Sequence, residues 1–289
     1  MTAYLTLELR RTLRDRRYLG IVVAWPVVAY LLFSTVFGAA ADRAEGLDPH
    51  VEIMVAMATF GAIGAVLMGT APRMAAERQS GWTRQLHLTP LRSSSVLAAR
   101  VMAAVLLTLP AICITFAAAS AVKGVTLPAW EWPTMVAVLL AGVVPFAALG
   151  TVIGNLTDGD SATGVTSIVY LTLAALGGLW MPVKVLPAEM RAVAHALPSY
   201  RLAELAWRVA AGHTPPVGAV AVLGAWAAAL TVLAVPVARR VASRGRPARA
   251  VRSIADHDRP VRRRRTRALG SPALGVERYL ARVPRLPDR

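Results

Sequence analysis

Two residue types that support enzyme chemistry, cysteine and lysine, are scarce in this sequence of 289 residues. Cys113 is the single cysteine, so neither a disulfide nor a CxxC metal or redox site can form within the chain. A P-loop needs a Gly-Lys pair followed by Ser or Thr, but the two lysines, Lys123 and Lys184, each follow a valine. The sequence therefore contains no ATP-binding site of the P-loop type.

Residues that could act together in catalysis or metal binding are also missing. The five histidines are dispersed without an HExxH motif or another metal-ligand spacing: His50, His87, His195, His213 and His257. Asp158 and Asp160 lie close together, but a tight turn explains that pair more simply than acid–base chemistry does. Without a nucleophile and base in a recognisable arrangement, we expect a chain that is not itself an enzyme and that binds no cofactor.

Charge is absent from six long apolar stretches. Hydrophobic residues make up 56% of the sequence and charged residues 17%, against about 25% charged residues in soluble domains. A helix needs about 20 apolar residues to cross a bilayer, and six uncharged stretches reach that length: Tyr18–Ala41, Ile53–Pro72, Val101–Val122, Trp132–Thr157, Ser161–Val183 and Thr214–Ala238. They predict an all-α membrane protein with six transmembrane helices within residues 18–238. We expect Cys113, inside the third stretch, to be buried.

Residues 1–17 carry two stripes at helical spacing. One stripe is apolar and the other is basic: Leu5, Leu9 and Leu13, then Arg10, Arg14 and Arg17. This pattern predicts an amphipathic helix at the membrane interface with its arginines toward anionic lipid headgroups; a plain basic flank of the first span is the alternative. The apolar stretch that follows is longer than the roughly 7–15 residues of a signal-peptide core, so we expect it to stay in the protein as the first helix.

Arginines are concentrated in segments predicted to face the cytoplasm. The N-terminal residues and the loop between the second and third spans are rich in arginine, whereas the first loop has Arg43 beside four acidic residues. Because cytoplasmic loops carry the excess of basic residues, both ends of a six-span chain lie in the cytoplasm. Two loops fit this rule less well. The fourth loop, Asn155–Asp160, is predicted to be cytoplasmic but has no basic residue, and the fifth is predicted to be external and still has four basic residues. The abundance of Arg, Ala and Val fits a GC-rich bacterial genome, and hence a bacterial plasma membrane.

The C-terminal tail, residues 239–289, is the most basic part of the sequence, with 16 arginines and four acidic residues. It has no apolar period and is interrupted by Pro and Gly, which predicts a disordered cytoplasmic segment that contacts anionic lipid. No aromatic stacking pattern accompanies the charge, so we expect no nucleic-acid partner. A membrane scaffold or receptor that acts through this basic tail is the alternative to a transport function.

The loop before the last span contains a second amphipathic pattern. Apolar residues repeat at helical spacing on one face and charged residues occupy the other: Leu202, Leu205, Ala206 and Val209, then Arg201, Glu204 and Arg208. We expect short external amphipathic or re-entrant helices that enter the outer leaflet between the fifth and sixth spans, with an ordinary surface loop as the alternative. In the fourth span, Gly150 and Gly154 have the small-xxx-small spacing that permits close helix packing.

The predicted spans lack the acidic and histidine residues on which ion-coupled carriers usually depend. Sodium held by backbone carbonyls at broken helices is an alternative that composition leaves open. If the protein moves a substrate uphill, we therefore expect the energy to arrive from a soluble partner. The polar segment 73–91, between the second and third spans, is the surface best placed to contact such a partner.

Three stretches resemble the permease subunit of type-2 ABC exporters, the bacterial drug, lipid and polysaccharide export family. Residues 76–91 are similar to the family's Glu-Arg, Gly, Leu and Thr-Pro-Leu segment, and residues 177–198 are similar to its Gly-x-x-x-Pro and Leu-Pro pattern. The amphipathic N-terminal helix is the third stretch. The resemblance covers roughly residues 1–240 and leaves the tail without a counterpart.

The resemblance implies that two permease chains pair, as a homodimer or a heterodimer, and recruit ABC ATPase subunits that bind ATP and Mg. It implies that segment 73–91 is a coupling helix, whose ATPase contacts would be Glu77, Arg78, Gly81, Trp82, Arg84, Leu86 and Pro90. The external pattern would comprise Gly178, Pro182, Pro187 and Pro198. The expected function is ATP-powered export of a hydrophobic or amphipathic substrate. Four aromatic residues are candidates for a lateral substrate path, with packing or a place at the membrane interface as the alternative: Trp25, Phe33, Tyr170 and Trp180.

Overall fold

The structure, a computed structural model, describes most of the chain from the first predicted span onward: residues 6, 16–38, 47–80, 93–180 and 187–244. Most of the predicted interfacial helix over residues 1–17 lies outside this part of the chain, as does nearly all of the Arg-rich tail. Both of these therefore stay predictions.

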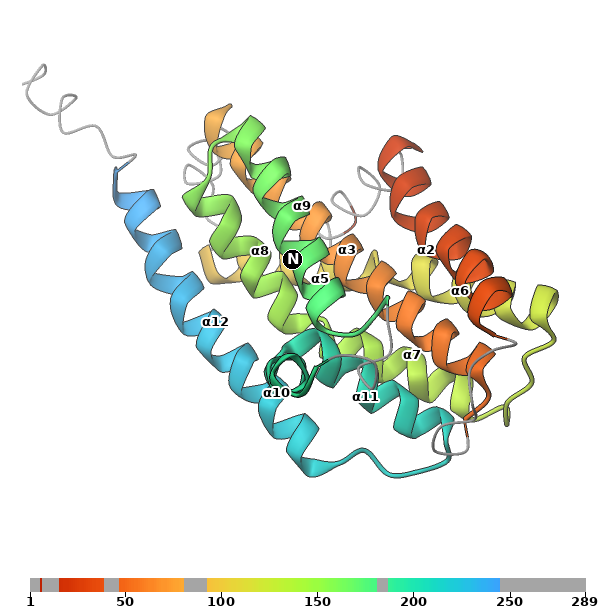
Figure 1. Cartoon of the computed structure of the whole chain (residues 1–289). Helices are drawn as coiled ribbons and strands as arrows, with labels where there is room; N and C mark the ends of the chain where they lie inside the picture. The colour runs from red at the N-terminus through yellow and green to blue at the C-terminus, as the bar shows by residue number, and fades with distance from the viewer. Residues whose placement is uncertain (1–5, 7–15, 39–46, 81–92, 181–186, 245–289) are drawn as a thin grey trace, which may run out of the picture. The chain divides into compact units, whose positions relative to one another are not determined.

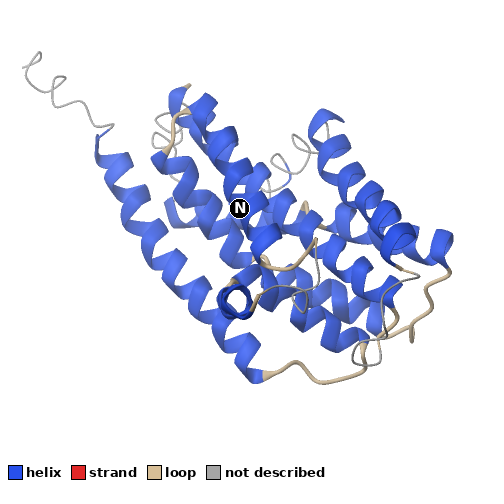
Figure 2. Ribbon diagram, viewed as in Figure 1, coloured by secondary structure: helices blue, strands red, loops and turns tan. Residues whose placement is uncertain are grey.

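Every regular element in the described residues is a helix, which confirms the all-α prediction (Figure 2). The helices are labelled in Figure 1 and have these bounds: α2 Arg16–Phe37, α3 Pro49–Gln79, α5 Ser93–Leu106, α6 Leu109–Lys123, α7 Glu131–Gly142, α8 Val144–Leu156, α9 Gly159–Leu176, α10 Ala188–Ala196, α11 Pro198–Ala210 and α12 Val217–Arg244. Each predicted span coincides with one or two of these helices.

Four helical segments within the described residues are long and apolar enough to cross a membrane: Pro49–Gln79, Ala98–Lys123, Glu131–Leu156 and Val217–Val237. They correspond to the second, third, fourth and sixth predicted spans. The first and fifth predicted spans coincide with the shorter apolar helices Val22–Phe37 and Ser161–Leu176. The count of six spans therefore stays a prediction for these two helices.

Two of the predicted spans are each divided into two helices. The third span contains α5 and α6, and the fourth contains α7 and α8. Pro110 and Pro145 each occupy the second position of the new helix, where the missing N–H removes no intrahelical hydrogen bond. A proline in the middle of an apolar stretch thus ends one helix and starts the next without a polar loop.

α3 is the central helix of this bundle. It packs against α2, α5, α6, α7, α8, α9 and α11, and Figure 1 shows it in orange between α2 in red and the green helices α8 and α9. Its large side chains are fully enclosed, among them Met54, Met57, Phe60, Ile63 and Leu67. Because most of its residues pack against other helices, the uniformly apolar composition of this span is used for packing within the bundle.

Glycines let α8 approach α3 closely. A Cβ atom added to Gly150 would lie 2.0 Å from Thr70 Oγ1, and one added to Gly154 would lie 2.7 Å from the Ala71 carbonyl oxygen. These distances leave no room for a side chain at either glycine. The close packing predicted from the small-xxx-small spacing is therefore confirmed.

The outer surfaces of several helices carry large apolar side chains. Exposed residues of this kind on α2 and α12 include Trp25, Val28, Leu32, Val36, Val217, Val220, Val232 and Leu233. Such surfaces suit the hydrocarbon of a bilayer, where a helix satisfies its backbone hydrogen bonds internally. Cys113 on α6 is exposed, so the prediction of a buried cysteine is wrong. Because α6 is apolar on all sides, its sequence does not indicate which way that side chain points.

Two short helices, α10 and α11, connect α9 to α12. The predicted amphipathic helix is confirmed as α11, whose apolar face is buried: Leu202, Leu205, Ala206 and Val209. On its other face Arg201 pairs with Glu204 at 2.7 Å. The Trp207 indole N–H donates to the Glu52 carbonyl at 3.0 Å, which joins the fifth loop to the start of α3. Entry of these helices into the outer leaflet stays a prediction.

Candidate functional site

The predicted coupling segment begins inside α3. This helix continues past the predicted span end at Pro72, and the Ser80 N–H then donates to the Ala76 carbonyl at 3.0 Å. Residues 73–79 of the segment therefore belong to α3, because residues 75–79 are strong helix formers, and the coupling helix expected over the rest of the segment stays a prediction. The other predicted contact residues lie outside the described part of the chain, and their roles stay predictions: Gly81, Trp82, Arg84, Leu86 and Pro90.

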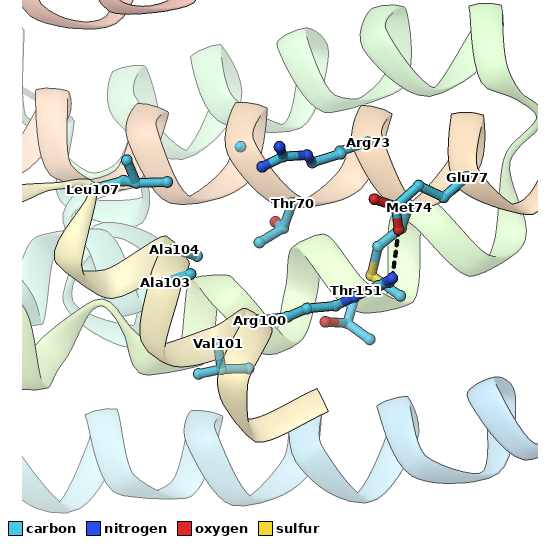
Figure 3. Close-up of a pocket in the computed structure, with 11 residues that line it drawn as sticks. Thr70, Arg73, Met74, Glu77, Arg100, Val101, Ala103, Ala104, Leu107 and Thr151 are labelled. Atoms are coloured by element: carbon cyan, nitrogen blue, oxygen red, sulfur yellow. Dashed lines mark hydrogen bonds and ion pairs between the residues drawn. The ribbon is translucent and has the colours of Figure 1, made fainter. Parts of the chain in front are cut away.

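Glu77 is buried at this end of α3. Its carboxylate accepts a hydrogen bond from the Arg100 guanidinium on α5, and the two side chains are 6% and 16% exposed. Figure 3 shows the ion pair bridging the two helices. Removing one partner of a buried pair strands the other charge, which typically costs about 3 to 5 kcal/mol. The sequence contains one indication of this pair, an acidic residue near the end of one span and a basic residue near the start of the next. The sequence analysis did not predict that the two residues pair.

A cavity of about 30 Å³ adjoins the ion pair and is lined by residues of α3, α5 and α8. Arg73 also lines it, and Figure 3 shows that side chain directed along α3, away from Glu77. The hydroxyl groups of Thr70 and Thr151 donate to carbonyl oxygens of their own helices at 2.7 and 2.9 Å. The cavity has room for about one or two water molecules and is far smaller than the roughly 300 Å³ of a small-molecule site.

Arg78 links the end of α3 to the connection between α8 and α9. Its guanidinium donates to the Asn155 carbonyl and, at 2.6 Å, to the Thr157 carbonyl, with Asp158 Oδ1 at 3.2 Å. The carbonyl contacts outweigh the ion pair, because the Asp158 side chain is 87% exposed and solvent screens its charge. The C-terminal end of α3 therefore meets the connection between α8 and α9.

Replacing Arg78 with alanine is expected to destabilise the folded chain by about 2 kcal/mol, because charge-assisted hydrogen bonds to two carbonyls are lost. Asp158→Asn should change the unfolding free energy by less than about 0.5 kcal/mol, as for other exposed ion pairs. Thermal unfolding of the purified protein in detergent, followed by tryptophan fluorescence, measures both changes. Equal losses for the two variants would show that the ion pair, and not the carbonyl contacts, holds this connection.

The described residues of the predicted external pattern lie on either side of α10. Gly178 has a φ of 70°, a left-handed conformation that glycine adopts without strain. Pro187 directly precedes α10, and Pro198 is the first residue of α11, where a missing N–H is tolerated. Pro182 lies outside the described residues. These residues set the backbone path into the two short helices.

The aromatic residues predicted for a substrate path separate into two groups. Tyr170 stacks on Phe60 with ring centroids 4.6 Å apart, and Trp180 meets Phe60 edge-on at 5.6 Å. Trp25, by contrast, is 56% exposed on the outer face of α2, while Phe33 on the same helix is partly buried against the core. The structure thus brings Tyr170 and Trp180 together against α3 and leaves Trp25 on the outer surface.

Comparison with known families decides the class of this chain. The family model described as ABC-2 type transporter matches residues 2–207. The chain belongs to the ABC-2 type transporter family. It is also similar to YvfS of Bacillus subtilis (strain 168), named as a transport permease, with 29% identity over 208 residues that cover 72% of this chain and 84% of that protein.

The family match confirms the resemblance to an ABC transporter permease. The matched residues of this ABC-2 type transporter include the Glu77–Arg100 pair and Arg78, whereas α12 lies beyond them. The charged groups at the C-terminal end of α3 thus belong to the part of the chain that the family model matches.

Proposed function

We propose that this ABC-2 type transporter permease exports a hydrophobic or amphipathic substrate with energy from ATP hydrolysis in a separate ABC ATPase subunit. The observation that supports the proposal best is the fixed geometry of the two helix ends that border segment 81–92. The buried Glu77–Arg100 pair joins α3 to α5, and Arg78 joins α3 to the connection between α8 and α9. A soluble partner that pushes on this segment would move these helices together.

The position of acidic residues in the spans supports an energy source outside the chain. In the four long candidate spans the acids lie at helix ends: Glu52, Glu77 and Glu131. Ion-coupled carriers instead place such residues near the middle of the membrane, beside the substrate. The described residues also contain no cluster of three or more potential metal ligands. Hydrolysis of ATP by a partner supplies energy without an ion-coupling site in this chain.

Purification of the tagged permease from native membranes tests the proposal. We expect an ABC ATPase to co-purify and to hydrolyse ATP in the eluate. Arg84→Glu and Trp82→Ala should each lower the amount of bound ATPase about tenfold, because arginine and tryptophan anchors dominate protein contacts. Arg191→Glu changes an exposed arginine on α10, in the loop predicted to be external, and should retain the ATPase as the matched control.

Two results would contradict this proposal. One is the absence of an ATPase from the wild-type eluate, and the other is equal retention of the ATPase by Arg84→Glu, Trp82→Ala and the Arg191→Glu control. The direction of transport has its own test: inside-out vesicles should accumulate a lipophilic dye when ATP is added. The mass of the intact complex shows whether it holds one or two copies of this permease.

A further inference from the structure

The ion pair between Glu77 and Arg100 lies between the two helices that border segment 81–92. Glu77 is in the last turn of α3, and Arg100 is in the second turn of α5. We propose that this pair is a positioning pair, which holds the two helix ends at a fixed spacing so that motion of segment 81–92 is passed to α3 and α5 as one unit. The inference rests on the proposed function of that segment, and it assigns Glu77 a role within the chain.

Packing near the pair fixes α5 only in part. The fully buried residues of α5 there are alanines, Ala99, Ala103 and Ala104, whose short side chains make few interlocking contacts, and Val101 and Val105 are partly buried against the core. The adjoining cavity of about 30 Å³ shows that the surroundings of the pair are not closely packed. The guanidinium-to-carboxylate bond is directional, so it defines the rotation and spacing of α5 where alanine packing does not.

The direction of the Glu77 side chain favours an internal role over a direct ATPase contact. Its carboxylate is 6% exposed and meets Arg100 Nη2 beside the cavity. A carboxylate buried to this degree offers little accessible surface to a partner protein. The next residue, Arg78, donates to carbonyls of the α8–α9 connection, so the unit formed by α3 and α5 is also tied to α8 and α9.

Spin labels at two exposed positions test the spacing directly. The labels are placed at Ala76→Cys on α3 and Ala98→Cys on α5, in a chain that also carries Cys113→Ala. Dipolar broadening of the spectrum reports the distance between the labels. We expect Glu77→Arg and Arg100→Glu each to weaken this broadening, and the double exchange to restore it. A role in folding alone would lower the yield and leave the spacing of the folded fraction unchanged, which would overturn the proposal.

ATP hydrolysis by the purified complex provides the second readout. Each single reversal should lower the hydrolysis rate per bound ATPase about tenfold, with recovery in the double exchange. If Arg100→Glu leaves hydrolysis unchanged while Glu77→Arg abolishes it and the double exchange does not recover it, then Glu77 contacts the ATPase directly and the positioning role is wrong.

Two further experiments separate failure of the proposed function from failure of the positioning role. If no ATPase accompanies the wild-type chain, the proposed function fails, and the spin labels still decide whether the pair fixes the two helix ends. Should the charge reversals yield no folded protein, Glu77→Gln replaces them, because it keeps the side-chain volume and removes the charge. Weakened broadening in Glu77→Gln supports the positioning role, and unchanged broadening rejects it.

Discussion

Gly154→Leu is expected to abolish accumulation of the folded permease, because the α8 backbone rests directly against α3 at this position. A Cβ atom there would lie 2.7 Å from the Ala71 carbonyl oxygen and 2.9 Å from Met74 Cβ. Neither neighbour can turn aside, since one is backbone and the other is bonded to it. Overpacking costs about 1 to 3 kcal/mol where side chains can adjust, and forcing two central helices apart costs more. The monodisperse fraction in detergent size-exclusion chromatography measures the loss.

Gly164→Leu on α9 is the matched control for this prediction, since a Cβ atom at Gly164 would meet nothing within 4 Å. That variant should retain the wild-type chromatographic peak. Gly154→Ala should fall between the two leucine variants, because a single methyl group demands a smaller separation of α8 from α3. Equal peaks for Gly154→Leu and Gly164→Leu would show that the two helices do not pack through Gly154.

The helices of this protein could be predicted from its sequence, but their places in the bundle could not. Uncharged stretches located the spans, because long membrane helices exclude charge, and a two-faced pattern located α11. The sequence did not indicate that α3 is the central helix, because a helix that faces lipid and a helix that faces protein are both apolar. The exposed Cys113 has the same cause, because α6 has no polar face from which a direction could be inferred.

For each contact of the candidate site, the sequence predicted one residue and not its partner. Glu77 and Arg78 stand out as charged residues in a polar segment, and the structure places both at the end of α3. Arg100 carries a weaker signal, because a basic residue beside a cytoplasmic loop is expected for orientation alone. The carbonyl partners of Arg78, at Asn155 and Thr157, carry no signal. Every residue has a carbonyl oxygen, so such contacts follow only from the fold.

Phe60→Ala is expected to lower the stability of the bundle by about 3 kcal/mol or more. Phe60 is fully buried on α3, with Tyr170 stacked on it and Trp180 at its edge. In a membrane protein the penalty comes from lost van der Waals contacts and an unfilled cavity, because lipid is as apolar as the core. Thermal unfolding in detergent measures the change. A Phe60→Ala protein that unfolds like the wild type would show that this cluster is not part of the core.

Tyr170→Phe and Trp25→Ala separate packing from substrate transport. Tyr170→Phe keeps the stacked ring and loses the hydrogen bond that the hydroxyl donates to the Phe60 carbonyl at 3.1 Å, a loss of about 1 kcal/mol. Trp25→Ala removes an exposed side chain and should change stability by less than about 0.5 kcal/mol.

If Tyr170 lines a substrate path, Tyr170→Ala alters dye transport at unchanged stability. Packing on Phe60 predicts instead that stability and transport fall together in Tyr170→Ala, while Trp25→Ala retains both.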